Sequence, residues 1–234
     1  GDIVASSVFP PLALVHVRHL LVSFHDAPNG TALIQGLWET ADQIDTSVIE
    51  MQEALKNGDE KLFRLKSEEL INQLVGSANK TQYMDWNKDG NIDDPGDGFG
   101  LLENGGEGGL GYIPMTISHA RYAAESTDAT ENIKIHSEHV IMSIDNMRGW
   151  SEQLLGKALQ LQVMSFGDEI KPVVLEMQLL SEQILFGVDT NGNELIEPIV
   201  GEGGSDTAYE HSYYMAEMPL LLGKHRIPPP ASTP

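Results

Sequence analysis

The sequence predicts an all-α fold, organised as a duplicated helical bundle of about seven helices that two long loops interrupt. Three observations support this fold class. Apolar residues recur at the three- and four-residue spacing of amphipathic helices. No segment keeps the period-two alternation of a half-buried strand over any length. Two Gly/Asp-rich segments, 85–111 and 189–204, also resemble each other, which favours an internal duplication.

Seven segments carry the helical pattern. In residues 32–55, Leu37, Ile44 and Met51 lie on one face and acidic residues separate them, which is typical of a helix with one buried side. The other predicted helices are 12–24, 60–75, 113–125, 130–163, 168–186 and 206–218. Short acidic side chains often cap helix starts, so Asp128 is expected to cap helix 130–163 and Asp206 the last helix.

The two ends of the chain have a different composition. Residues 1–11 are predicted to form an extended tail, with a short strand at 2–9 that the following proline pair ends. Residues 205–226 are predicted as a C-terminal helix and 227–234 as a Pro-rich tail. Tails of this kind become ordered by docking on a surface, so we expect a homo-oligomer or polymer assembled through the terminal tails.

Composition excludes several classes of partner. The chain has 14 Lys and Arg residues against 35 Asp and Glu, a formal net charge of −21, which repels phosphate backbones. Nucleic acid is therefore not an expected partner. The longest apolar runs fall short of the roughly 20 residues that cross a bilayer, so no membrane insertion is expected. The absence of cysteine excludes a disulfide scaffold.

Several short motifs recur in the same order along the chain. Each of the two interruptions contains an Asp-x-Asn-x-Asp/Asn run, and a helix segment with Ser-Glu precedes each one. The pair His16-x-x-His19 recurs as His119-x-x-Tyr122. We therefore predict one repeat over 12–111, with a cation loop at 85–97, and a second over 112–204, with a cation loop at 189–202.

Oxygen-bearing side chains alternate in the first loop. Asp85, Asn87 and Asp89 occupy loop positions one, three and five, Gly90 follows at position six, and Ile92 is at position eight. Ca²⁺ takes six to eight oxygen ligands, and a loop supplies them when such side chains alternate and a glycine permits a sharp turn. The fold prediction is therefore a duplicated helical bundle with two calcium-binding loops, and Ca²⁺ is the expected cofactor.

Over about a dozen residues each, the two loops resemble EF-hand and dockerin-type calcium loops. The resemblance implies side-chain ligands from Asp85, Asn87 and Asp89 and a backbone carbonyl ligand from Asn91. Gly96 stands at the twelfth position in place of a bidentate acid, so Asp93, Asp94 or Asp97 must close the site, with Asp94 and Asp97 favoured.

The second loop departs further from the pattern. The resemblance implies Asp189, Asn191 and Asn193 as ligands, but Glu194 replaces the glycine at position six. Its missing carboxylate is expected from one of two later acids, Glu197 or Glu202. Fewer charged ligands predict weaker binding than in the first loop.

The histidines form a second candidate constellation. His16 and His19, like His136 and His139, are three residues apart, so each pair presents two imidazoles on one helix face. His119 and His211 occupy related positions, which makes a transition-metal or haem site in the bundle conceivable. No Glu-x-x-His di-iron signature, nucleophile elbow or phosphate loop occurs, so no catalytic residue and no enzyme activity are expected.

The sequence thus predicts a secreted or cell-surface protein with a structural or adhesive role. Calcium would stabilise it, and it would assemble with itself into a filament or lattice. Weak calcium loops suit the extracellular space, where Ca²⁺ is near millimolar. The alternative is a histidine-rich helical bundle that binds a transition metal or haem for redox or transport chemistry.

Overall fold

The computed structural model describes residues 5–7, 9–105 and 109–222, and it confirms the all-α class. Within these residues it contains seven helices, two short strands and two 3-10 turns, Pro28–Gly30 and Asp168–Ile170. The helices and strands are β1 (Ala5–Ser7), α1 (Pro11–Leu21), α2 (Leu33–Asn57), α3 (Glu60–Val75), α4 (Tyr112–Glu125), α5 (Glu131–Gln162), α6 (Lys171–Phe186), α7 (Ser205–Tyr214) and β2 (Leu220–Leu222).

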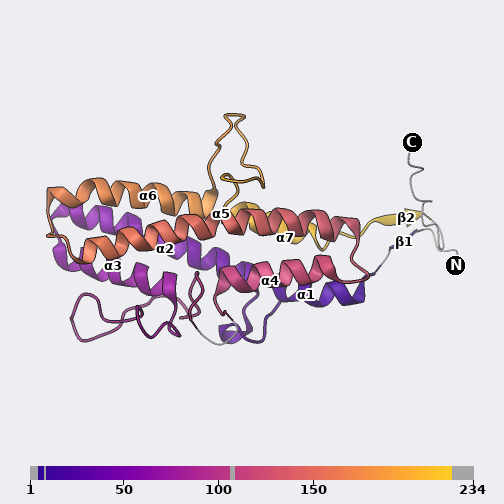
Figure 1. Ribbon diagram of the computed structural model, residues 1–234, viewed down its shortest axis with the longest axis horizontal. Helices are drawn as coiled ribbons and strands as arrows, with labels where there is room; N and C mark the ends of the chain where they lie inside the picture. Colours follow the sequence, from indigo (N-terminus) through magenta and orange to yellow (C-terminus); the bar gives the residue numbers. More distant parts are fainter. Residues whose placement is uncertain (1–4, 8, 106–108, 223–234) are drawn as a thin grey trace.

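The helices form an elongated bundle (Figure 1). At one end α2 packs against α3 and α6, and the second half of α5 runs beside them. At the other end α4 packs against α1 and α5, and α7 lies against α5. Helix α5 therefore runs through both ends and joins them.

The predicted apolar faces make up the core. Leu37, Ile44 and Met51 of α2 are fully buried, as are Val140 and Met147 of α5. The buried apolar side chains form one contiguous cluster that draws on all seven helices. This single core holds the two ends of the bundle in a fixed relation.

The helix caps differ from those expected. Asp128 does not cap α5; its carboxylate accepts hydrogen bonds from Leu12 N (2.7 Å) and Ala13 N (3.0 Å), so it caps α1 from across the bundle. Thr130 caps α5 through a bond from Ile133 N. Asp206 accepts a hydrogen bond from Trp38 Nε1 at 2.7 Å and caps nothing. Tertiary packing brings these partners within reach of both acids.

Two short strands near the ends of the described chain form a small ribbon. Strand β1, inside the predicted strand 2–9, pairs antiparallel with β2. The predicted helix 205–226 ends at Tyr214, and β2 follows it. Residues 1–4, part of the predicted N-terminal tail, and the Pro-rich tail 227–234 lie outside the described residues. Among the described helices, none combines the length and apolar character needed to cross a bilayer.

Candidate metal sites

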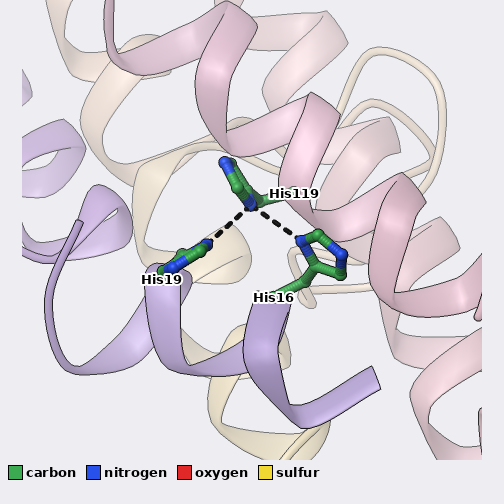
Figure 2. A group of neighbouring side chains, drawn as sticks. All are labelled: His16, His19 and His119. Atoms are coloured by element: carbon green, nitrogen blue, oxygen red, sulfur yellow. Dashed lines mark hydrogen bonds between the residues drawn. The ribbon is translucent and has the colours of Figure 1, made fainter. Parts of the chain in front are cut away.

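Three histidines from two helices converge at the first site (Figure 2). His16 and His19 lie one turn apart on α1, and His119 reaches them from α4. The Nδ1 atom of His119 lies 3.1 Å from Nδ1 of His16 and 3.1 Å from Nδ1 of His19. Because the spacing of three residues puts both α1 rings on one face, a single ring from α4 completes the triad.

A second triad repeats this arrangement with other helices. His136 and His139 lie one turn apart on α5, and His211 reaches them from α7. The Nδ1 atom of His211 lies 2.8 Å from Nδ1 of His136 and 3.3 Å from Nδ1 of His139. Within the described part of the chain, these triads are the groups of three or more His, Asp or Glu ligand atoms that lie within 4.8 Å of one another.

Hydrogen bonds between neutral imidazoles do not account well for the geometry. A ring nitrogen carries either one proton or one lone pair, directed in the ring plane, so it forms one good hydrogen bond. Yet Nδ1 of His119 faces two other Nδ1 atoms, and Nδ1 of His211 does the same. Nitrogens bound to one tetrahedral ion at 2.0–2.1 Å lie about 3.3 Å apart. The separations from His119 are both 3.1 Å and those from His211 are 2.8 and 3.3 Å, at or somewhat below that ligand spacing.

Burial favours the neutral form of five of the six triad histidines. It is the main cause that lowers the pKa of His119 and of His211 to about 4, and the neighbouring histidines contribute to both shifts. Burial also lowers the pKa of His16, His19 and His136. Imidazoles must be deprotonated to bind a metal ion, so these lone pairs are available at neutral pH.

A tyrosine flanks each triad at the same position. Tyr122 follows His119 by one turn, and its ring centroid lies 5.3 Å from that of His16. Tyr214 follows His211 by one turn, and its ring centroid lies 5.1 Å from that of His136. The two sites therefore share a His-x-x-His helix and a His-x-x-Tyr helix, which is the pairing that the sequence analysis missed.

The predicted repeat boundary cuts through this arrangement. A division at 111/112 puts His16 and His19 in one repeat and His119 in the next. The structure instead pairs the His16 motif with the His119 motif in one site, rather than placing them at equivalent positions of two sites. Units 11–125 and 131–214 would each keep one triad and one loop intact.

In the first calcium-type loop, Asp85 organises the backbone. Its Oδ1 accepts hydrogen bonds from the N–H groups of Lys88 (2.6 Å) and Asp89 (3.2 Å), and its Oδ2 from that of Gly90 (2.9 Å). Asn87 accepts from Asp89 N, and Asp89 accepts from Asn91 N. The alternating side chains predicted as ligands thus all accept hydrogen bonds from backbone N–H groups of their own loop.

The second loop has the same hydrogen bonds. Asp189 Oδ1 accepts hydrogen bonds from the N–H groups of Gly192 (2.6 Å) and Asn193 (3.3 Å), and its Oδ2 accepts one from that of Glu194 (2.8 Å). The side chain of Asn191 accepts from Asn193 N.

Both loops also share their unusual backbone conformation. The fourth and sixth positions have positive φ: Lys88 (63°) and Gly90 (101°) in the first loop, Gly192 (77°) and Glu194 (68°) in the second. Glu194 adopts the left-handed conformation that glycine adopts more easily. The substitution at position six therefore strains the second loop without changing its path.

The acids expected to close the loops lie in different surroundings. Asp94 accepts from Gly96 N, and Asp97 accepts from Phe99 N and from the Tyr112 hydroxyl at the start of α4. Glu197 lies beside the predicted ligands of the second loop, because its Oε2 accepts from the side-chain amides of Asn191 (3.2 Å) and Asn193 (2.7 Å).

Two fully buried glutamates accept hydrogen bonds from groups of the two loops. Glu202 joins positions two and nine of its loop, accepting from Thr190 Oγ1 and Glu197 N. Glu68 of α3 does the same for the first loop, accepting from the N–H groups of Trp86, Asn87 and Asp93. Burial raises the pKa of Glu68, while these N–H groups oppose the shift. Glu68 is not among the site residues expected from the sequence, although it shares a helix face with apolar residues.

Comparison with known proteins yields no match among family models, curated proteins or solved structures. The fold and the sites define the class of the molecule, a helical bundle that carries two tri-histidine clusters and two Asp/Asn loops.

Proposed function

We propose that this protein binds transition-metal ions, one divalent ion in each histidine triad. The convergence of three Nδ1 atoms at ligand spacing, repeated at two places, carries the proposal. Imidazole suits Zn²⁺, Cu²⁺ and Ni²⁺, whereas Ca²⁺ and Mg²⁺ take oxygen ligands. Zn²⁺ is the ion we propose, because three imidazoles are a common zinc ligand set. The net charge of −21 further favours cations near the surface.

Metal stoichiometry tests this proposal directly. The metal-stripped protein is dialysed against Zn²⁺ and its bound zinc is measured by mass spectrometry, with binding heats from calorimetry. Two ions per chain are expected for the unaltered protein, one for His119→Ala or His211→Ala, and none for the double variant. His25→Ala is the matched control, because His25 is exposed and outside both triads. Zinc retained by the double variant at two ions per chain contradicts the proposal.

We also propose a structural calcium ion in each Asp/Asn loop. The observation that favours it is the identical hydrogen-bond pattern around Asp85 and Asp189 in loops of different sequence. Added Ca²⁺ should raise the melting temperature, because a ligand that binds only the folded state stabilises it. Asp85→Asn should abolish most of that rise and Asp189→Asn less. Glu53→Gln, on an exposed part of α2, should leave it unchanged.

An extracellular or cell-surface location and assembly through the chain ends complete the proposal. Weak calcium loops fill where Ca²⁺ is abundant. Apolar side chains of Phe9, Leu12 and Leu220 are exposed close to the β1–β2 ribbon, which supports assembly at this end. Light scattering of the unaltered protein and of Phe9→Ser measures the mass. A monomer at high concentration in Ca²⁺ contradicts the assembly.

A further inference from the structure

We infer that the metal ion in each triad keeps one coordination position for an exchangeable external ligand. This inference rests on the proposed metal-binding function. Each triad offers three nitrogen donors, whereas a tetrahedral ion has four positions. The identity of the fourth donor therefore decides whether the sites only tie helices together or also bind a small molecule.

The acids nearest to the first triad do not complete it. Asp26 is close enough to raise the pKa of His119 and His19 slightly against the larger effect of burial. However, its Oδ1 pairs with Nδ1 of His25 at 2.7 Å, on the exposed side of the loop. Its oxygens also lie outside the group of ligand atoms within 4.8 Å of one another.

The acids near the second triad do not complete it either. Glu217 raises the pKa of His136 and Glu210 raises that of His211, in each case less than burial lowers it. Neither carboxylate belongs to the 4.8 Å group. Glu210 instead accepts a hydrogen bond from the Tyr214 hydroxyl, which leaves both groups engaged with each other.

Both triads are partly exposed. His119 is buried, but His16 and His19 beside it are half-buried. All three histidines of the second triad are half-buried. The inference places the exchangeable ligand on the exposed side of each triad. In both sites a tyrosine ring, that of Tyr122 or Tyr214, packs beside the single histidine that precedes it by one turn.

Three protein nitrogens and one exchangeable water are characteristic of zinc sites that act on a bound molecule, whereas structural zinc sites use four protein ligands. The fourth position in each triad then accepts a small anion or another oxygen or nitrogen donor in place of water. The duplicate Tyr-flanked arrangement favours the same ligand at both sites.

Cobalt substitution tests the inference, because the visible absorption of Co²⁺ responds to a change of ligand. The protein is loaded with Co²⁺ and titrated with azide. His211→Ala reports the first site alone and His119→Ala the second. We expect a shift of the Co²⁺ bands that saturates with azide at both sites. Tyr122→Phe and Tyr214→Phe should bind azide equally well, since the inference gives the fourth position to an exchangeable ligand and not to a tyrosine.

The outcomes separate the two proposals. Bound Co²⁺ whose spectrum azide leaves unchanged means that a fourth protein ligand closes the site, and it overturns the inference alone. A spectrum that changes on Tyr→Phe substitution before azide is added identifies that ligand as tyrosine and also overturns it. Unaltered protein that binds no Co²⁺ and no Zn²⁺ overturns the proposed function and the inference together.

Discussion

His119 and His211 each provide the nitrogen that the other two rings of their triad share. Burial and the neighbouring rings lower the pKa of both to about 4. In the unfolded chain their pKa is near 6.5. Without metal, His119 and His211 are therefore neutral bases that resist protonation as long as the protein stays folded.

Metal-free protein should lose stability as the pH falls below 6.5. Between pH 6.5 and about 4 the unfolded state binds protons at His119 and His211 that the folded state does not. The free energy of unfolding therefore decreases as the pH decreases. Between pH 6.5 and 5.5 the expected loss is about 1 kcal/mol for each of the two residues. Urea unfolding in the presence of a chelator measures it.

The double variant His119→Gln/His211→Gln is the control for this prediction. It keeps the carboxylates with raised pKa, such as Glu68 and Asp94, whose protonation acts in the opposite direction. Its stability should change less between the same two pH values. Equal pH dependence in both proteins would show that the triads are not the source.

At the scale of elements, α2 and α4 approach closely at Gly36. A Cβ atom added at Gly36 would lie 2.1 Å from the ring of Tyr112, which is fully buried at the start of α4. The hydroxyl of Tyr112 donates to Asp97 of the first loop. Because Gly36 has no side chain, Tyr112 can pack directly against α2. This contact positions α4, which carries His119, and the end of the first loop at Asp97.

Two glycine-to-alanine substitutions in helices should have opposite effects. Gly36→Ala forces the Tyr112 ring to move and should destabilise the protein by about 1–3 kcal/mol, the range for overpacked cores. Gly149→Ala, in α5, meets open space and should stabilise by up to about 1 kcal/mol through helix propensity. Denaturant unfolding of both variants gives the comparison. A neutral Gly36→Ala would contradict the close packing.

At the scale of the whole molecule, one core joins units 11–125 and 131–214. The contacts between α4 and α5 and between α2 and α6 cross from one unit to the other. The buried apolar residues of both units belong to one cluster. Neither unit therefore has a separate interior, even though each contains one triad and one loop.

The metal-free protein should unfold in a single cooperative transition, as expected for one shared core. Trp86 reports on the first loop and Trp150 on α5, so two single-tryptophan variants follow different parts of the chain. Their fluorescence midpoints should coincide with each other and with the loss of helical circular dichroism. Separate midpoints for the two reporters would mean that the units unfold independently.

The helices, the two loops and the pairing of histidines on one helix face could all be predicted from the order of the amino acids. These features depend on local spacing, because backbone geometry places residues three or four apart on the same side of a helix. Asp85, Asn87 and Asp89 could be singled out for the same reason, since their alternation lies within one short loop. Their predicted role as calcium ligands remains a prediction.

The fold alone selected which distant groups meet. It joined His119 to the pair on α1 and His211 to the pair on α5. It also gave Asp128 the N-terminus of α1 as its partner, and it placed Glu68 behind the first loop. Such contacts join residues far apart in the chain, and the packing of the apolar faces selects them. Local spacing contains no information about that choice.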